Sequence, residues 1–244
     1  MTARRLDVAL VELGLARSRT VAARLVREGR VLVDGRPARR PSSPVRPGQR
    51  IDAQAEPWVS RGAYKLLGAL EDLPVPVTGR VLDAGASTGG FTQVLLESGA
   101  DRVYAVDVGH GQLDSSVAAD GRVVVREGLN LRDLTLGDLD GAPVDLVVGD
   151  VSFISLRMLL APLEAVCAAG ARMLLLVKPQ FEVGRADLGA HGVVTDQGLR
   201  DRAVDRVVDD AASLGWTVTG RAPSRITGQD GNQEYFIRLE RAGS

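Results

Sequence analysis

The fold is decided by the stretch Val81-Leu82-Asp83-Ala84-Gly85-Ala86-Ser87-Thr88-Gly89-Gly90-Phe91, an apolar β-type run followed by a glycine-rich turn. Glycines in such a turn let a ligand approach the backbone closely. Their spacing fits neither the G-x-G-x-x-G pattern of dinucleotide sites nor the lysine-containing pattern of a P-loop. The next apolar run ends in Asp107, where a carboxylate can accept hydrogen bonds from ribose hydroxyls. The stretch therefore predicts a strand that leads into a ligand-binding turn.

Short apolar runs recur from this stretch to the end of the chain, separated by segments of helical character. They cover residues 81–82, 103–106, 123–125, 144–148, 173–177, 217–218 and 235–239. Strands that alternate with helices predict an α/β fold with a mostly parallel, doubly wound sheet. Ligands of such sheets bind beyond the carboxyl ends of the strands, so the turn and Asp107 are expected to lie together.

The first 60 residues are basic and the rest of the chain is acidic. Residues 1–60 hold 12 Arg and 6 acids, a net of +6, and residues 61–244 hold 18 Lys+Arg and 25 acids, a net of −7. A basic segment joined to an acidic body suggests a nucleic-acid-binding part fused to something else. Apolar spacing predicts two short helices in this segment, the second capped by Ser18, followed by strands near residues 31–33 and 50–53.

The arginines of this segment have few acids beside them in the sequence, since Glu28 is the only acid between Arg17 and Arg30. That pattern suits phosphate contacts that do not depend on base sequence, although a solvated charged helix is the alternative. The segment resembles the RNA-binding domain of ribosomal protein S4, through residues 18–35 and 45–51. RNA contacts are expected from Arg4, Arg17, Arg19, Arg24, Arg27, Arg30 and Arg36.

The small number of cysteines and histidines excludes several kinds of site. The single cysteine, Cys167, lies in an apolar stretch and is interpreted as core, which excludes a disulfide and a cysteine-based zinc site. The two histidines form no triad-like or metal-like pattern, so no metal is expected. The longest apolar stretch is far shorter than the ~20 residues that span a bilayer. Together with the acids near the N-terminus, these features predict a cytoplasmic protein without a membrane partner, and a monomer is favoured.

Only two of the 30 basic residues outside histidine are lysines, Lys65 and Lys178. Lys178 directly follows the apolar run 173–177, at the expected active edge of the sheet, and Lys65 precedes the first strand. Arginine cannot replace a lysine that must lose its proton or act as a compact point charge. Chance survival of the two lysines is the alternative, and their positions favour a functional role.

The chain resembles the TlyA family of rRNA 2′-O-methyltransferases, whose catalytic domain is related to the FtsJ-type ribose methyltransferases. The matching runs are residues 59–66, 82–92, 105–113, 150–156, 177–184 and 231–236. The resemblance implies a Rossmann-like methyltransferase domain behind a small α+β S4-type domain, with S-adenosylmethionine as cofactor and ribosomal RNA as partner. The family's catalytic set falls on Lys65, Asp150, Lys178 and Glu234.

The resemblance also implies roles for individual residues. Lys178 would take the proton of the ribose 2′-hydroxyl or stabilise the developing alkoxide, Asp150 and Glu234 would orient the lysines, and Lys65 would help place the ribose. Cofactor contacts are expected from Asp83, Gly85, Ser87, Thr88, Gly89, Gly90, Phe91, Asp107, Val108, Asn130 and Asp150. The expected domains are residues 1–53 and 62–244, joined by a linker at 54–61.

The expected target is a cytidine ribose of ribosomal RNA. Action on large-subunit (23S) rRNA alone is favoured over action on both subunits (16S and 23S), because the chain ends soon after its last strand and lacks a C-terminal helix of some relatives. Base methylation is disfavoured, since Gly149-Asp150-Val151-Ser152-Phe153 lacks the prolines of amino-methylating enzymes. Two rival functions are a haemolysin-like membrane-active protein and a non-catalytic RNA-binding ribosome-assembly factor.

Overall fold

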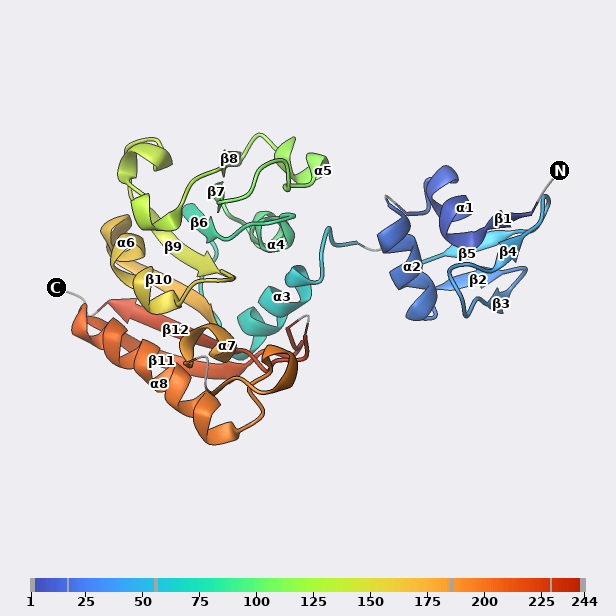
Figure 1. Ribbon diagram of the computed structural model, residues 1–244. Helices are drawn as coiled ribbons and strands as arrows, with labels where there is room; N and C mark the ends of the chain where they lie inside the picture. The colour runs from blue at the N-terminus through green and yellow to red at the C-terminus, as the bar shows by residue number, and fades with distance from the viewer. Residues whose placement is uncertain (1–2, 17, 55–56, 185–186, 229, 242–244) are drawn as a thin grey trace. The chain divides into compact units, whose positions relative to one another are not determined.

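The structure is a computed structural model, and it describes residues 3–16, 18–54, 57–184, 187–228 and 230–241. The chain divides into two compact units, residues 1–57 and 58–244, whose elements are labelled in Figure 1. Residues 58–61, expected in the linker, lie in the second unit: Val59 is buried there, and its backbone N–H donates to Gln93 Oε1 at 2.9 Å.

The first unit is a small α+β domain. Its two helices pack against each other, and Ser18 caps the second by accepting a hydrogen bond from the Val21 N–H at 3.3 Å, as the sequence predicted. Leu6, Leu10 and Leu25 form the centre of the core. The elements are β1 (Arg4–Arg5), α1 (Leu6–Glu12), α2 (Arg19–Arg27), β2 (Val31–Val33), β3 (Arg36–Pro37), β4 (Pro44–Val45) and β5 (Ile51–Ala53), in sheets β1-β4 and β3-β2-β5.

The second unit is built on a seven-stranded sheet in the order β11-β12-β10-β9-β6-β7-β8. The strands are β6 (Arg80–Ala84), β7 (Arg102–Asp107), β8 (Val123–Glu127), β9 (Val144–Gly149), β10 (Cys167–Val177), β11 (Trp216–Pro223) and β12 (Tyr235–Arg241). The strands from β10 to β8 pair in parallel, and β12 is antiparallel to both of its neighbours. All seven predicted strands form, and the prediction of a mostly parallel sheet is confirmed.

Helices cover both faces of this sheet. The helices are α3 (Gly62–Asp72), α4 (Gly90–Glu97), α5 (Ser115–Ala118), α6 (Leu160–Ala165), α7 (Pro179–Glu182) and α8 (Gln197–Ser213), with short 3-10 turns at residues 131–133, 136–139, 156–158 and 190–192. Side chains alternate between faces along a strand. Leu174 therefore packs in the core with α3 and α4, and Leu175 packs in the core with α6 and α8.

β6 and β9 lie side by side at the centre of the sheet. The strands that follow β6 in the chain, β7 and β8, extend the sheet on one side, and those that follow β9 extend it on the other. Such a switch point opens a crevice beyond the carboxyl ends of the strands. The turn after β6, the end of β7, the end of β9 and the end of β10 all meet at this edge. They carry Gly85, Asp107, Asp150 and Lys178 respectively. Among the helices of the described residues, none has the length and apolar character needed to cross a membrane.

Candidate active site

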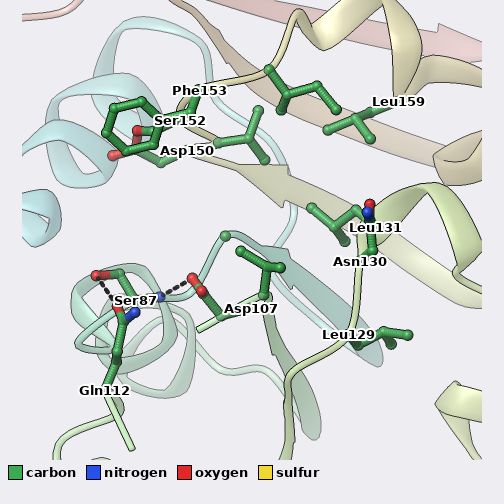
Figure 2. A pocket seen from close by; sticks show the side chains of 14 residues that line it. Ser87, Asp107, Gln112, Leu129, Asn130, Leu131, Asp150, Ser152, Phe153 and Leu159 are labelled. Atoms are coloured by element: carbon green, nitrogen blue, oxygen red, sulfur yellow. Dashed lines mark hydrogen bonds between the residues drawn. The ribbon is translucent and has the colours of Figure 1, made fainter. Parts of the chain in front are cut away.

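A cavity of about 430 Å³ lies at the carboxyl ends of the parallel strands (Figure 2). Its volume is in the range of small-molecule sites. Six of its lining residues were expected from the sequence: Gly85, Ser87, Asp107, Val108, Asn130 and Asp150. The others were not expected and are mostly apolar: Gln112, Leu129, Leu131, Val151, Ser152, Phe153, Ile154 and Leu159. They lie in the loops and short 3-10 turns that follow the strands, where no periodic pattern marks them.

The turn after β6 packs its backbone against the backbone that follows β9. Gly85 has a φ of +87°, and a Cβ there would lie 2.9 Å from the carbonyl oxygen of Asp150, so only glycine fits. Asp107 holds the two loops beside the turn: its Oδ2 accepts from the Ser87 N–H at 2.9 Å and its Oδ1 from the Gly109 N–H at 2.7 Å. Because a carboxylate has about four acceptor positions, Asp107 can still accept hydrogen bonds from a ligand.

Glu127, at the end of β8, fixes the other side of the cavity and was not expected from the sequence. Its carboxylate accepts the backbone N–H groups of Gly111, Gln112 and Leu113 at 2.6, 2.8 and 3.2 Å. These hydrogen bonds lower the pKa of Glu127, because they stabilise its charged form. Glu127 therefore holds the part of the loop that carries Gln112 to the cavity wall, and Asp107 holds its start at Gly109.

Asp83 was expected at the cofactor, and the structure places it inside the protein instead. It lies in β6 and is fully buried, and its Oδ2 accepts a hydrogen bond from Thr92 Oγ1 of α4 at 2.6 Å. Burial raises the pKa of Asp83 to about 7, more than the hydrogen bond from Thr92 lowers it. Asp83 thus connects the strand to the helix behind the turn.

The later residues of the turn also lie outside the cavity lining. Thr88 is exposed, and its carbonyl oxygen accepts from the Asp114 N–H at 3.3 Å. Gly89 has a φ of +89° and precedes α4. A Cβ on Gly90 would lie 2.9 Å from the backbone nitrogen of Ala63, so this glycine lets α3 and α4 approach. Phe91 is only 4% exposed and belongs to the core.

The four residues of the expected catalytic set form one continuous cluster. Lys65 comes from α3, Asp150 follows β9, Lys178 follows β10, and Glu234 precedes β12. Lys65 Nζ donates to Glu234 Oε2 at 2.7 Å and lies 3.6 Å from Asp150 Oδ2. Lys178 Nζ lies 2.5 Å from Asp150 Oδ1. Two ammonium groups and two carboxylates alternate, so the charges of this largely buried cluster balance.

The cluster adjoins the cavity through two residues. Ser152 Oγ accepts a hydrogen bond from Lys178 Nζ at 2.7 Å, and Ser152 and Asp150 both line the cavity (Figure 2). A group bound in the cavity therefore lies next to the two partners of Lys178. Gln180 joins the cluster from the other side, where its Nε2 donates to Glu234 Oε1 at 3.3 Å. Neither Ser152 nor Gln180 was expected, and their only signal is proximity in sequence to Asp150 and Lys178.

The arginines of the first unit have more acidic partners than their sequence suggested. Arg4 pairs with Glu12, and Arg19 Nη2 lies 3.2 Å from Asp7 Oδ2. Within the cluster expected from the sequence, Arg19 thus has an acidic partner in α1 that is distant in sequence. The carboxyl of Asp7 is buried, and hydrogen bonds from Arg5, first, and Arg19 lower its pKa to about 2.

The remaining arginines of that set differ in their surroundings. Arg24 and Arg30 lie 4.0 and 3.9 Å from the two carboxylate oxygens of Glu28. Arg27 and Arg36 are exposed, and within the described part of the chain Arg27 makes no side-chain hydrogen bond or ion pair. Arg17 lies outside the described residues. The side chains of Arg24 and Arg30 are only 20% and 22% exposed, so the exposed Arg27 and Arg36 are better placed to contact phosphates.

Cysteine and histidine take no part in the site. Cys167 is half-buried in β10, and burial raises the pKa of its thiol to about 12, which agrees with a core residue and not a nucleophile. His110 and His191 are exposed. The described residues contain no group of three or more histidine, cysteine or acidic side chains that could hold a metal ion.

Comparison with known proteins identifies both units. Residues 58–241 match the model of the FtsJ-like methyltransferases, and residues 4–51 match that of the S4 domain. The 16S/23S rRNA (cytidine-2′-O)-methyltransferase TlyA of Mycobacterium tuberculosis is 49% identical over 239 residues, 96% of this chain and 89% of that protein. The chain belongs to the TlyA family of FtsJ-like methyltransferases. The expected α/β methyltransferase fold with an N-terminal S4 domain is confirmed.

Two further relatives of this TlyA-family chain are informative. The 23S rRNA (cytidine-2′-O)-methyltransferase TlyA of Campylobacter jejuni is 37% identical over 195 residues, 78% of this chain and 73% of that protein. A solved structure from Streptococcus thermophilus, named as a candidate hemolysin, is 36% identical with a TM-score of 0.78, and the match covers 100% of this chain and 90% of that one.

As an FtsJ-like methyltransferase, the chain uses S-adenosylmethionine as its methyl donor. The cavity fits such a molecule chemically. Asp107 offers carboxylate acceptors for ribose hydroxyls, Gly85 leaves the backbone open to close approach, and Leu129 and Leu131 provide apolar walls for a ring.

Proposed function

We propose that this chain transfers a methyl group from S-adenosylmethionine to the ribose 2′-hydroxyl of a cytidine in ribosomal RNA. The observation that carries the proposal is the cluster of Lys65, Glu234, Asp150 and Lys178 at the wall of the cavity. A 2′-hydroxyl is a weak nucleophile that must lose its proton during attack. A lysine placed beside a methyl donor, and oriented by a carboxylate, meets that need.

The cofactor is held by the residues of the cavity in this proposal. Asp107 would accept from the ribose hydroxyls, Val108 and Asn130 would contact the ring, and Gly85 and Ser87 would contact the methionine part. When bound, S-adenosylmethionine supplies a methyl group on a positively charged sulfur that a nucleophile can displace. Asp83, Gly90 and Phe91 contribute from behind by fixing the turn to α3, to α4 and to the core, and Thr88 and Gly89 fix it to the segment at residues 113–117.

Lys178 acts on the reacting hydroxyl. Lys178 Nζ would accept the proton of the 2′-hydroxyl as the hydroxyl oxygen attacks the methyl group that S-adenosylmethionine would supply. To accept this proton, the amine of Lys178 must be neutral when the substrate is bound. The ammonium that results is stabilised by Asp150 at 2.5 Å and by Ser152 at 2.7 Å.

The other residues orient the reacting groups. Asp150 holds Lys178, Glu234 holds Lys65, and Lys65 places the ribose through its remaining N–H donors. Each lysine has one close carboxylate, which leaves donors free for substrate. Holding a nucleophile and an electrophile in reactive geometry can supply roughly 7–11 kcal/mol of the lowering of the barrier.

The S4 domain binds the ribosomal RNA in this proposal, through arginines that contact phosphates. Large-subunit rRNA is the proposed target, since 23S rRNA appears in the names of both the Mycobacterium and the Campylobacter relatives. A cytoplasmic location follows from a ribosomal substrate. The acidic second unit repels RNA by its net charge of −7, so binding by the basic unit, with a net of +6 over residues 1–60, is needed.

The test is to map ribose methylation by mass spectrometry on rRNA from cells with the protein, without it, and with Lys178→Ala. We expect one cytidine of 23S rRNA to lose its 2′-O-methyl group in the last two strains. Purified Lys178→Ala should still bind RNA. An rRNA methylation pattern that is the same in all strains overturns the proposal, and loss of a 16S site identifies small-subunit rRNA as a second target.

Membrane damage is the rival function, because the Streptococcus relative is named as a candidate hemolysin. Release of a fluorescent dye from phosphatidylcholine–phosphatidylglycerol vesicles separates the two. We expect no release at micromolar protein, and release that persists in the Lys178→Ala variant would support the rival function.

A further inference from the structure

Gln180 lies in α7, the single helical turn that begins directly after Lys178. Its Nε2 donates to Glu234 Oε1 at 3.3 Å, while Lys65 Nζ donates to the other oxygen of that carboxylate, Oε2, at 2.7 Å. Glu234 is only 2% exposed, so these two donors define its surroundings. Gln180 is absent from the lining of the cofactor cavity.

The other end of the Gln180 amide lacks a partner. Gln180 Oε1 is shielded from solvent and accepts no hydrogen bond within the described residues. A buried acceptor without a donor lowers the stability of the folded state. Reversing the amide would bring Oε1 against the carboxylate oxygen of Glu234, so the donor must face Glu234. A methionine of similar length would avoid the unpaired acceptor but would lose the hydrogen bond to Glu234, so the amide donor is what glutamine adds at this position.

A second contact keeps α7 in place. Glu182, two residues further along this turn, accepts from the Leu156 N–H at 2.7 Å and from Ser155 Oγ at 2.6 Å. These bonds attach α7 to the loop that follows Ser152. The position of Gln180 is thus fixed from both ends of the turn, by Lys178 at its start and by Glu182 at its end.

We propose that Gln180 is a positioning residue for methyl transfer, which acts through Glu234 on Lys65. This inference rests on the proposed function. Without the amide donor, the carboxylate of Glu234 keeps Lys65 as its one side-chain donor among the described residues, and it draws Nζ of Lys65 away from Asp150, 3.6 Å distant. Lys65 then no longer directs its free donors to the ribose. The unpaired Gln180 Oε1 lowers the stability of the folded state. We infer that glutamine is kept at this position because its amide donor is needed for activity.

The decisive variant is Gln180→Met, because structural and functional roles predict opposite results for it. We expect kcat per folded molecule to fall about 10-fold, equivalent to ~1.4 kcal/mol, with KM for S-adenosylmethionine unchanged. A merely structural glutamine predicts a lower Tm with kcat per folded molecule unchanged. Gln54→Met, at an exposed position of the first unit, is the matched control and should change neither quantity.

Gln180→Glu gives an independent readout. The charged groups at that position are Glu234 and Lys65, with Asp150 and Lys178 beyond them. At pH 8 the new carboxylate repels Glu234, and at lower pH its protonated form donates again. We expect the ratio of variant to wild-type kcat to rise as the pH falls from 8 to 6.

These outcomes separate the inference from the proposed function. A flat kcat ratio for Gln180→Glu, or full kcat for Gln180→Met, overturns the role of Gln180 alone. Absence of methyl transfer by the wild-type protein overturns the proposed function and this inference with it.

Discussion

Lys178 Nζ and Asp150 Oδ1 lie 2.5 Å apart, and this ion pair joins the ends of the neighbouring strands β10 and β9. Asp150 also lines the cofactor cavity, and its other oxygen lies 3.6 Å from Lys65 Nζ. One carboxylate therefore connects the cavity, the proposed base and the second lysine. Its position at the switch point of the sheet accounts for this, because the ends of central parallel strands meet there.

Replacing Lys178 by arginine tests whether this residue accepts a proton. Arginine keeps the positive charge but does not lose a proton at any pH of interest. We expect Lys178→Arg to lose methyl transfer by about 10²–10⁴-fold, the usual contribution of proton transfer by a side chain. The measurement is single-turnover transfer from radiolabelled S-adenosylmethionine. Calorimetry should show unchanged cofactor binding, and activity within a few-fold of wild type would instead support stabilisation of an alkoxide by charge.

Asp83 makes stability depend on pH. Its pKa is about 7 in the folded protein, against 3.8 as the ordinary value. Below the ordinary value both states are protonated, and as the pH rises toward 7 only the unfolded state ionises, so stability falls. Above about 7 the loss, on the order of a few kcal/mol, is complete. Asp83→Asn removes this dependence. The free energy of unfolding of the variant in urea, minus that of wild type, should therefore increase from pH 5 to pH 8.

The control for that measurement is Asp133→Asn, which alters an exposed acid. Its difference from wild type should stay constant over the same pH range. A constant difference for Asp83→Asn as well would show that Asp83 is ionised throughout.

Gly90 sets the distance between α3 and α4. A Cβ at this position meets Ala63 of α3, and α3 carries Lys65. We expect Gly90→Ala to destabilise the protein by about 1–3 kcal/mol, as overpacking does, and to lower kcat by displacing Lys65. Gly121→Ala is the matched control, because a Cβ at Gly121 would have no other atom within 4 Å and should be tolerated. Equal stability of the two variants in thermal unfolding would contradict the close packing.

Arg27 tests the RNA role of the first unit. This exposed arginine makes no side-chain ion pair within the described part of the unit, so it is free to contact a phosphate. We expect Arg27→Ala to weaken binding to rRNA fragments and to reduce the slope of log K against log salt concentration by about 1. Arg206→Ala, at an exposed position of α8 in the second unit, serves as control. An unchanged salt slope for Arg27→Ala would remove this residue from the RNA interface.

Much of the fold was predictable because it follows from local patterns of apolar and capping residues. The apolar runs from Val81 to Leu239 became strands, since strands buried on both faces need continuous apolar residues. Ser18 became a cap because its hydroxyl suits the first free N–H groups of a helix. The edge of the sheet was predictable too, because parallel strands present their carboxyl ends together, which brought Asp107, Asp150 and Lys178 to one place.

Orientation within the turn was decided only by the tertiary structure. Asp83 and Phe91 adjoin the glycines in sequence, but Asp83 alternates with its neighbours in β6 and points toward Thr92 of α4. Phe91 lies in the first turn of α4 and faces Phe236 in the core, with ring centroids 6.3 Å apart. A motif marks the position of a turn along the chain, and it does not say which side chains face the ligand.

By itself the sequence determined the strands, the domain types and the identities of the two lysines. Folding decided which carboxylate each lysine meets: Lys65 reaches Glu234 across 169 positions, and Arg19 meets Asp7 of the preceding helix. The physical reason is the distance along the chain over which each effect acts. Propensity and periodicity act over a few residues, whereas an ion pair depends on which strand ends and helices the packed core brings within a few ångströms.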